Sequence, residues 1–429
     1  MMGPPMTEAA VPLPPRRPFP QAWMALPIAG VALGQRFVLP GASIADLTLA
    51  AFTALGLAHL ARVARETGRR PSLPPWWRWL FALWAWALVG GAVHVLSGTE
   101  LFSLLEFWKS LAKLSFYAVA VVVMALALRD SPRAAPSRMV LTAFGATGAV
   151  AIALYVAMRM GLPLPYRLLW GHGTEASYFS DLWWFGGQHE ARNVFLRAQG
   201  VASEPSRLGY LQCMALAYLF LGPGARVRLG LRLILIVVSL LLTFSLTAYA
   251  LLLPVVALTL LTRWRVRRLE TQRRGLVLAA AVVLLLLPLA PTIYKTVVVR
   301  AVRAVAGAGD TSSFLRVKGN WKMTYYLLET SPVVGVGLGN FDVVVWDLRA
   351  FLFDGYLISK DTQGWNVFAY VLATLGAPGL LLLLALLVSA FRGRGRLAVP
   401  YVLGMFADGT FLGVAFWLFF ALYTTEGEG

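Results

Sequence analysis

Long apolar stretches separated by short polar turns run through nearly the whole chain. A helix needs about 20 apolar residues to cross a membrane. The pattern predicts membrane-spanning helices near residues 22–40, 42–62, 77–96, 101–127, 139–160, 205–222, 229–245, 248–262, 275–294, 366–390, 398–408 and 410–425. We therefore predict an all-α polytopic membrane protein with about twelve transmembrane helices.

The predicted helices form one transmembrane domain, 22–425, between a disordered cytoplasmic tail, 1–21, and a short C-terminal tail, 426–429. No small-residue cleavage site follows the first apolar stretch, so we expect no signal peptide. The last two predicted helices are short. They could instead be one tilted helix broken at Asp408 and Gly409, which would place the C-terminus outside.

Composition agrees with a membrane protein, because 59% of the 429 residues are hydrophobic, only 14% are charged and the mean hydropathy is +0.69. A net charge of +18 would suggest a nucleic-acid partner in a soluble protein. Here the arginines gather in alternate turns, at 62–70, 129–138, 226–232, 263–274 and 392–396. Such turns face the cytoplasm and touch anionic lipid headgroups, so we expect no nucleic-acid partner.

The other turns, and two long loops at 161–204 and 295–365, then face the opposite side, the periplasm of a bacterial inner membrane. The single Cys213 lies in an apolar stretch, which excludes a disulfide framework within the chain. The four histidines lack metal-ligand spacing, so we expect neither a metal nor a cofactor.

Charged residues within the predicted spans are costly in hydrocarbon and are usually paired or functional. Arg36 and Asp46 lie near the outer ends of the first two spans. Glu106, Lys109 and Lys113 follow each other at i, i+3 and i+7, which places them on one helix face. Either Glu106 and Lys109 form an internal pair that holds the bundle together, or this face is a cationic wall on which Lys113 meets a phosphate.

Basic, acidic and aromatic residues concentrate in the two long loops and beside them. The first loop carries His189, Arg197 and Glu204, and Arg207 follows where Ser203-Glu204-Pro205 predicts the start of a helix. The second loop has a helical pattern over 312–329 that presents Arg316, Lys318, Lys322, Tyr325 and Tyr326. The many aromatic residues fit either an interfacial belt or a carbohydrate site.

Pro332 is expected to end the helix in the second loop. Gly335, Gly337 and Gly339 then predict a flexible turn whose backbone amides can approach a ligand closely. The GxGxG spacing alone is weak evidence for phosphate, because neither a preceding strand nor a GK[ST] ending accompanies it.

Several segments resemble the superfamily of O-antigen polymerases and O-antigen ligases. In the second loop these are Ser312-Ser-Phe-Leu-Arg316 with Trp321, and Ser331-Pro332-Val-Val-Gly335-Val-Gly337-Leu-Gly339-Asn340-Phe341. The stretch from Arg197 to Tyr210, with Gly200 and Glu204-Pro205-Ser206, and the stretch from Asn366 to Gly376 are also similar to the family. The resemblance covers about residues 195–390, and the predicted layout of spans covers the whole chain.

The resemblance implies a metal-independent, inverting membrane glycosyltransferase of the GT-C type, which acts on undecaprenyl-diphosphate-linked glycans at the periplasmic face. Its partners would be the lipid-linked donor, a lipid-linked acceptor, a flippase and a chain-length regulator. Fixed cations would stabilise the leaving diphosphate, with Arg316 first and Arg197 second in that role. Substrate-binding positions would be Lys318, Lys322, Tyr325, Tyr326, Arg207, Lys113, His189, Gly337, Gly339 and Asn340.

Two departures from the family pattern concern the activation of the acceptor. Ligases carry a histidine just before the Asn-x-aromatic segment, where this chain has Trp365, and many members have Ser-Arg-Gly where it has Ser245-Leu246-Thr247. Glu204 is then the candidate base, with His189 and Asp361 behind it. These departures favour a polymerase, with a ligase as the alternative. A transporter is disfavoured, because the polar groups gather at the outer surface rather than along a midplane path.

Overall fold

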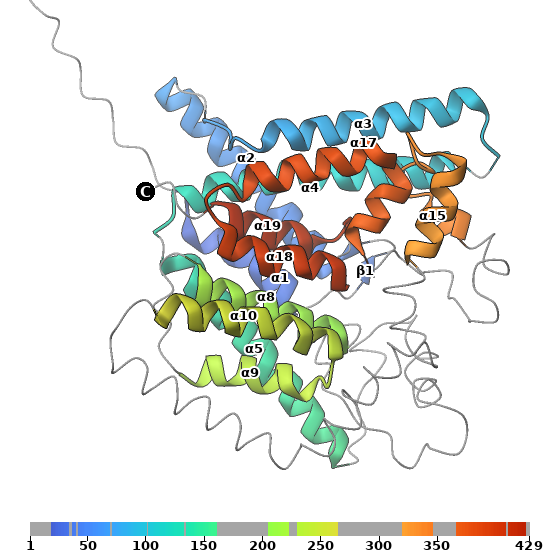
Figure 1. Cartoon of the computed structure of the whole chain (residues 1–429). Helices are drawn as coiled ribbons and strands as arrows, with labels where there is room; N and C mark the ends of the chain where they lie inside the picture. The colour runs from blue at the N-terminus through green and yellow to red at the C-terminus, as the bar shows by residue number, and fades with distance from the viewer. Residues whose placement is uncertain are drawn as a thin grey trace, which may run out of the picture.

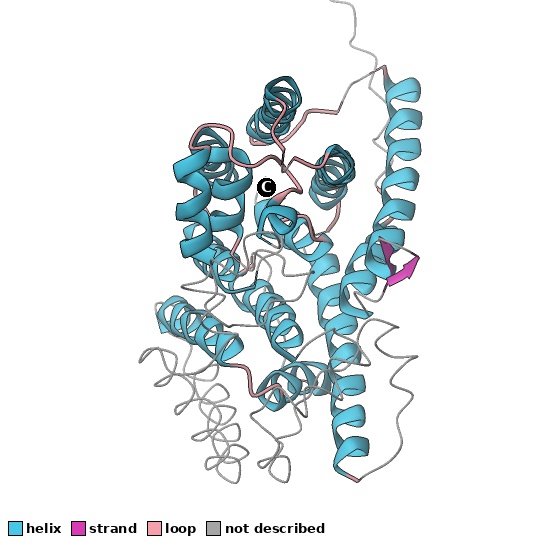
Figure 2. Ribbon diagram, turned by 90° about the vertical axis from the view of Figure 1, so that its right-hand side faces the viewer, coloured by secondary structure: helices cyan, strands magenta, loops and turns pink. Residues whose placement is uncertain are grey.

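The computed structural model describes residues 19–33, 37–39, 42–68, 71–100, 102–132, 134–160, 205–222, 230–264, 320–345, 366–408 and 411–425. The described chain is predominantly helical, and Figure 2 looks along several of its helices. The elements are η1 (Gln21–Met24), α1 (Ala25–Leu33), β1 (Phe37–Leu39), β2 (Ala42–Ser43), α2 (Ile44–Thr67), α3 (Trp77–Ser97), α4 (Leu104–Arg129), α5 (Ala134–Arg159), α8 (Pro205–Leu221), α9 (Leu231–Leu242), α10 (Leu246–Trp264), α15 (Asn320–Thr330), α17 (Val367–Ala390), α18 (Gly395–Asp408) and α19 (Val414–Thr425) (Figure 1).

Five of the described helices are long and apolar enough to cross a membrane: α2, α3, α4, residues Ala134–Ala157 of α5, and α17. The predicted spans at 205–222, 229–245, 248–262, 398–408 and 410–425 coincide with the shorter helices α8, α9, α10, α18 and α19. Three predicted segments lie wholly outside the described residues: the span at 275–294, the first long loop at 161–204 and the C-terminal tail at 426–429. Most of the second long loop and of the N-terminal tail also lies outside them. The apolar helices therefore identify a membrane protein, and the count of twelve remains a prediction.

The first predicted span, 22–40, was wrong in its second half. The helix α1 ends at Leu33, and β1 then pairs with β2 in a short antiparallel hairpin, with Phe37 opposite Ser43 and Leu39 opposite Ala42. Pro40 and Gly41 lie between these strands in the sequence, and both residue types favour turns over helix. The hairpin leads directly into α2.

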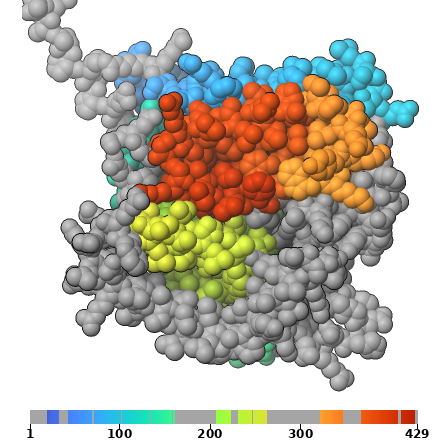
Figure 3. Space-filling view, in the orientation of Figure 1, coloured from blue at the N-terminus to red at the C-terminus, as the bar shows by residue number. Residues whose placement is uncertain are grey.

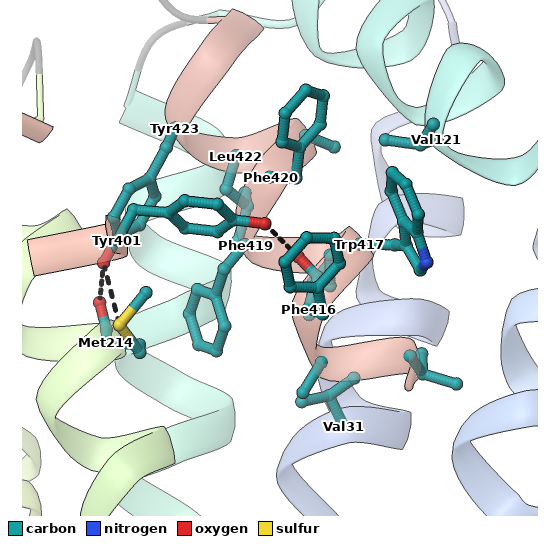
Figure 4. Close-up of a cluster of buried hydrophobic side chains, with 14 of the residues drawn as sticks. Val31, Val121, Met214, Tyr401, Phe416, Trp417, Phe419, Phe420, Leu422 and Tyr423 are labelled. Atoms are coloured by element: carbon teal, nitrogen blue, oxygen red, sulfur yellow. Dashed lines mark hydrogen bonds between the residues drawn. The ribbon is translucent and has the colours of Figure 1, made fainter. Parts of the chain in front are cut away.

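The centre of the bundle is α19, whose residues from Val414 to Thr424 are all buried. Its aromatic side chains pack against α1, α4 and α18 (Figure 4). The Tyr401 hydroxyl of α18 donates to Phe416 O at 3.0 Å, and the Tyr423 hydroxyl donates to Met214 O of α8 at 2.6 Å. Because lipid is as apolar as these side chains, close packing and internal hydrogen bonds hold such a helix in place.

The ends of the helices define two sides of the bundle. The end of α3, the start of α4 and α15 lie together on the right of Figure 1. The end of α4 and the start of α3 lie on the left. The candidate site lies toward the first of these two ends.

Candidate functional site

The helix α17 is broken in its middle. Gly376 has φ 67° and ψ −171°, a backbone conformation that is essentially open only to glycine. In a regular α-helix the N–H of residue 378 would donate to Thr374 O. Residue 378 is Pro378, which has no N–H, so this hydrogen bond cannot form. The break therefore leaves carbonyl groups inside the helix that need other donors.

The segment 331–340, which we call the glycine-rich loop, supplies those donors. Val336 N donates to Ala373 O at 2.9 Å, and Gly337 N donates to Thr374 O at 3.0 Å. In return, Ala377 N donates to Pro332 O at 3.0 Å. Non-helical backbone at membrane depth is tolerated only where such partners satisfy it, and the loop provides them.

The glycines of this loop are required by close contacts. Gly335, Gly337 and Gly339 have φ of 65°, 88° and 83°. A Cβ on Gly335 would overlap with the backbone of α17 at Ala373 and Thr374, and one on Gly339 would overlap with Ser110 of α4. We expected amides free for a ligand, but the Gly337 N–H is already bonded to α17. The roles of Gly337 and Gly339 in substrate binding stay predictions.

The helix α3 fixes the other side of the loop. His94 Nε2 lies 2.9 Å from Gly335 O, and Nδ1 lies 3.2 Å from the Thr99 hydroxyl. Because a carbonyl oxygen only accepts, Nε2 carries the hydrogen. Trp86 Nε1 donates to Leu375 O of the α17 break at 2.8 Å. Both side chains thus tie α3 to the break and to its loop.

The buried Asn340 joins the loop to the start of α4. Its Oδ1 accepts from Ser103 N at 2.6 Å, and Ser103 is the N-cap of α4. The Asn340 N–H donates to Gly337 O at 3.1 Å, which closes the loop. A role in fastening helices therefore accounts for Asn340, and its predicted role in substrate binding stays untested.

The helix α15 packs on α17 and presents part of its predicted face to the outside. Met323 and Leu327 are buried against α17 and the residues after the loop, and Thr324 donates to Ala369 O at 3.2 Å. Lys322 is exposed and Tyr325 is 68% exposed, whereas Tyr326 is partly buried against the same cluster. In Figure 3 residues 320–345 form one continuous surface with α17.

On α4, the two interpretations of the charged face apply to different residues. Glu106 and Lys109 form the predicted pair, with Lys109 Nζ 2.8 Å from Glu106 Oε1. Lys113, one turn further along, is exposed and has neither an ion pair nor a hydrogen bond within the part of the chain that the structure describes. Lys113 therefore has a charge available for an anion.

Polar residues at the start of α2 and within α4 form a second cluster: Ser43, Asp46 and Tyr117. Asp46 Oδ2 accepts from Ser43 N at 2.8 Å and Ser43 Oγ accepts from Asp46 N at 3.1 Å, which completes a capping box. The Tyr117 hydroxyl donates to Asp46 Oδ1 at 2.7 Å. Arg207, another of the predicted substrate-binding residues, lies in the first turn of α8 and is partly buried.

Sequence reasoning identified Asp46 as a charge within a span but missed Tyr117. The capping box, Ser43 followed three residues later by an acid, is readable in the sequence, whereas the Tyr117 contact joins residues 71 positions apart. The predicted site residues His189, Arg197, Glu204, Arg316 and Lys318, and with them Asp361 and Trp365, lie outside the described residues. Their roles stay predictions.

No family model matches the chain, and no curated protein matches it either. The fold and the candidate site define a helical membrane protein with a broken helix, a glycine-rich loop that completes the break, and exposed lysines on α4 and α15.

Proposed function

We propose that the chain is a polysaccharide polymerase of the bacterial inner membrane. It would transfer a glycan from an undecaprenyl-diphosphate donor to a lipid-linked acceptor sugar at the periplasmic face, by a metal-independent, inverting mechanism. About twelve transmembrane helices would place the loops 161–204 and 295–365 on that face. A flippase would supply the lipid-linked substrates, and a chain-length regulator would act beside the enzyme.

One observation supports this proposal most. The glycine-rich loop, on which much of the family resemblance rests, completes the broken α17 through Val336 and Gly337 and is bonded to α3 and α4. Arg316 lies four residues before Asn320, the first residue of α15, and the loop begins directly after that helix. These hydrogen bonds between the loop and three helices support a catalytic site near the loop, because catalytic cations act best when the elements that carry them are rigid.

The chemistry requires a base and fixed cations. Glu204 would remove the proton of the acceptor hydroxyl as its oxygen attacks the anomeric carbon of the donor sugar. The bond from that carbon to the phosphate oxygen would break on the opposite face, and the lipid diphosphate would leave with the electron pair. Arg316 and Arg197 would meet its growing charge with bidentate hydrogen bonds.

An O-antigen ligase, which transfers finished glycan to lipid A-core or to a protein, is the second candidate. It uses the same donor and the same leaving group. The presence of Trp365 in place of the ligase histidine favours the polymerase. A transporter of lipid-linked oligosaccharide is the third candidate.

The products of the reconstituted full-length protein separate these three functions. With lipid-diphosphate repeat units as the sole substrate, a polymerase yields a ladder of glycans on lipid. A ligase gives no reaction until lipid A-core is added, and a transporter moves the substrate across the bilayer without changing it. Either of the last two results would overturn the proposal. The ladder should persist in chelator, and a loss that a divalent ion restores would refute the metal-independent mechanism.

A further inference from the structure

The depth at which the glycine-rich loop meets α17 follows from the length of that helix. Ala377, which donates to Pro332 O, lies thirteen residues before Ala390, the last residue of α17, and therefore about 20 Å along the helix. The arginines at 392–396 follow that end and mark the cytoplasmic boundary. In a hydrocarbon layer about 30 Å thick, the contact then lies about 10 Å below the periplasmic boundary.

The helix α3 gives the same depth independently. It lies beside α17 and runs in the opposite direction (Figure 1). Val334 O lies 3.6 Å from the position that a Cβ on Gly90 would occupy. Gly90 lies thirteen residues after Trp77, the first residue of α3, which is again about 20 Å along a candidate span. The loop therefore meets both helices inside the hydrocarbon layer.

The chain descends to this level and rises again. Before the loop, α15 is bonded to the first half of α17 through Thr324. The backbone of Val333 lies against Gly376 at the break. Asn340 then accepts from Ser103 N, the N-cap residue of α4, at the end of the bundle that also holds the end of α3. A segment that enters a membrane and leaves it on the same side is a re-entrant loop.

The lowest part of the loop, Pro332 and Val333, which we call the tip, is apolar and open to the outside. Pro332 is exposed and Val333 is 56% exposed, whereas Leu338 and Asn340 further along the loop are fully buried. Exposed side chains of α3 and α17 near this level are likewise apolar, among them Val89, Val93 and Leu381. Such a surface matches lipid hydrocarbon better than water.

The backbone at the tip is suited to hydrocarbon, where irregular segments need internal hydrogen bonds. Pro332 O accepts from Ala377 N, and Pro332 has no N–H that would need a partner. Gly335 N donates to a carbonyl within the loop. Glu329, the last charged residue before the tip, is exposed and needs the headgroup layer or water, so the insertion is shallow.

We infer that the glycine-rich loop is a re-entrant membrane element whose tip contacts the hydrocarbon chains of the periplasmic leaflet. Its partner is thus a lipid surface, and its glycines serve close packing of the inserted segment on α3, α4 and α17. The inference does not rest on the proposed polymerase function. Under that function, the isoprenoid chain of a lipid-linked substrate lies in the layer that the tip enters.

Fluorescence quenching in liposomes tests the position of the tip in the full chain. Single cysteines replace Val333, Glu100 or Leu381 in a Cys213→Ala background, and each is labelled with bimane. We expect Val333→Cys to resemble Leu381→Cys, on the exposed apolar side of α17, with strong quenching by phosphatidylcholine that carries a nitroxide on its acyl chain. Iodide in the water should quench it severalfold less than Glu100→Cys, in the exposed turn after α3.

Iodide quenching at Val333→Cys equal to that at Glu100→Cys would place the tip in water and overturn the inference. Quenching by neither reagent would overturn it as well, because another part of the chain would then cover the tip. Neither readout depends on turnover, so a missing glycan ladder would remove the polymerase function and leave the re-entrant loop in place.

A charge at the tip gives a second, independent test. Val333→Asp should accelerate amide hydrogen exchange at Val336 and Gly337 at least about tenfold in nanodiscs, because a carboxylate in hydrocarbon favours withdrawal of the loop. Val333→Leu is the matched control and should exchange like wild type. Exchange in Val333→Asp that equals wild type would contradict contact between the tip and lipid.

Discussion

Glycine at position 337 combines two requirements that no other residue meets. Its φ of 88° is strained for any residue with a Cβ, and a Cβ there would also overlap with the Phe102 ring. Its N–H meanwhile completes the α17 break through Thr374 O. The sequence indicated the unusual backbone at this position, but not the partner, which lies 37 residues further along the chain.

We expect Gly337→Ala to destabilise the protein by about 2–4 kcal/mol, because the substitution adds backbone strain to a steric overlap. Thermal unfolding in detergent measures this. Gly68→Ala is the matched control: Gly68 has φ 64° at the end of α2, but its Cβ would meet open space. It should cost only about 1–2 kcal/mol. Equal losses in the two variants would show that the loop packing is not as described.

Glu204 is the residue on which acceptor activation depends in the proposed mechanism. Glu204→Gln should lower kcat by about a hundredfold or more, because a general base contributes on that order, while donor binding changes little. Single-turnover kinetics with separately measured donor affinity checks this. Glu329→Gln, an exposed acid on α15, should retain full activity. An unchanged rate for Glu204→Gln would direct attention to His189 or Asp361.

At the scale of elements, α17 illustrates what a sequence pattern conceals. Its apolar run predicted one continuous span, and the bounds agree with the helix 367–390 to within a residue. The sequence also contains Gly376 and Pro378, which permit a break. That the break forms, and that a loop from 331–340 fills it, follows from hydrogen bonds between distant segments, which no local pattern encodes.

Pro378→Ala should weaken the docking of the glycine-rich loop. An alanine at 378 has an N–H that can compete with Gly337 for Thr374 O, and it favours helix by about 3 kcal/mol over proline. We expect amide hydrogen exchange at Val336 and Gly337 to accelerate at least about tenfold, equivalent to a loss of about 1.4 kcal/mol of local stability.

Pro254→Ala, which changes the proline inside α10, is the matched control and should leave exchange at Val336 and Gly337 unchanged. Exchange at these two amides that is equal in Pro378→Ala and wild type would contradict the role given to the break.

Some elements were predictable because their signals are local. Ser43 and Asp46 mark the start of α2, and Ser103 marks the start of α4. The hairpin β1–β2 was missed, because the apolar residues before Pro40 were interpreted as continuing a helix. A short apolar run is ambiguous between helix and strand, and here tertiary context decided the outcome.

For the whole molecule, the positive-inside rule and the arrangement of helices lead to the same topology prediction. The turn from α3 to α4 and the turn from α4 to α5 lie at opposite ends of the bundle (Figure 1). Arginines gather around the second of these turns, at 129–138, whereas the first turn contains none. The turn between α3 and α4 is therefore expected on the periplasmic side.

Single cysteines test this topology in a Cys213→Ala background. We expect Glu100→Cys to react with a membrane-impermeant maleimide in intact spheroplasts. Pro132→Cys and Arg392→Cys should react only after the membrane is permeabilised. All three positions are exposed, so access to the reagent and not burial sets the result. Labelling of Glu100→Cys and Pro132→Cys from the same side would contradict α4 as a membrane span.

The most direct test of the central claim combines the ladder assay with one variant. Wild-type protein should extend lipid-diphosphate repeat units into a ladder. Arg316→Ala should lower turnover at least about a hundredfold, because it removes a cation that stabilises the leaving diphosphate, while its thermal stability matches wild type. Arg392→Ala, at an exposed position in an arginine-rich turn, serves as the control and should form the ladder normally. A full ladder from Arg316→Ala, or none from wild type, would contradict the account.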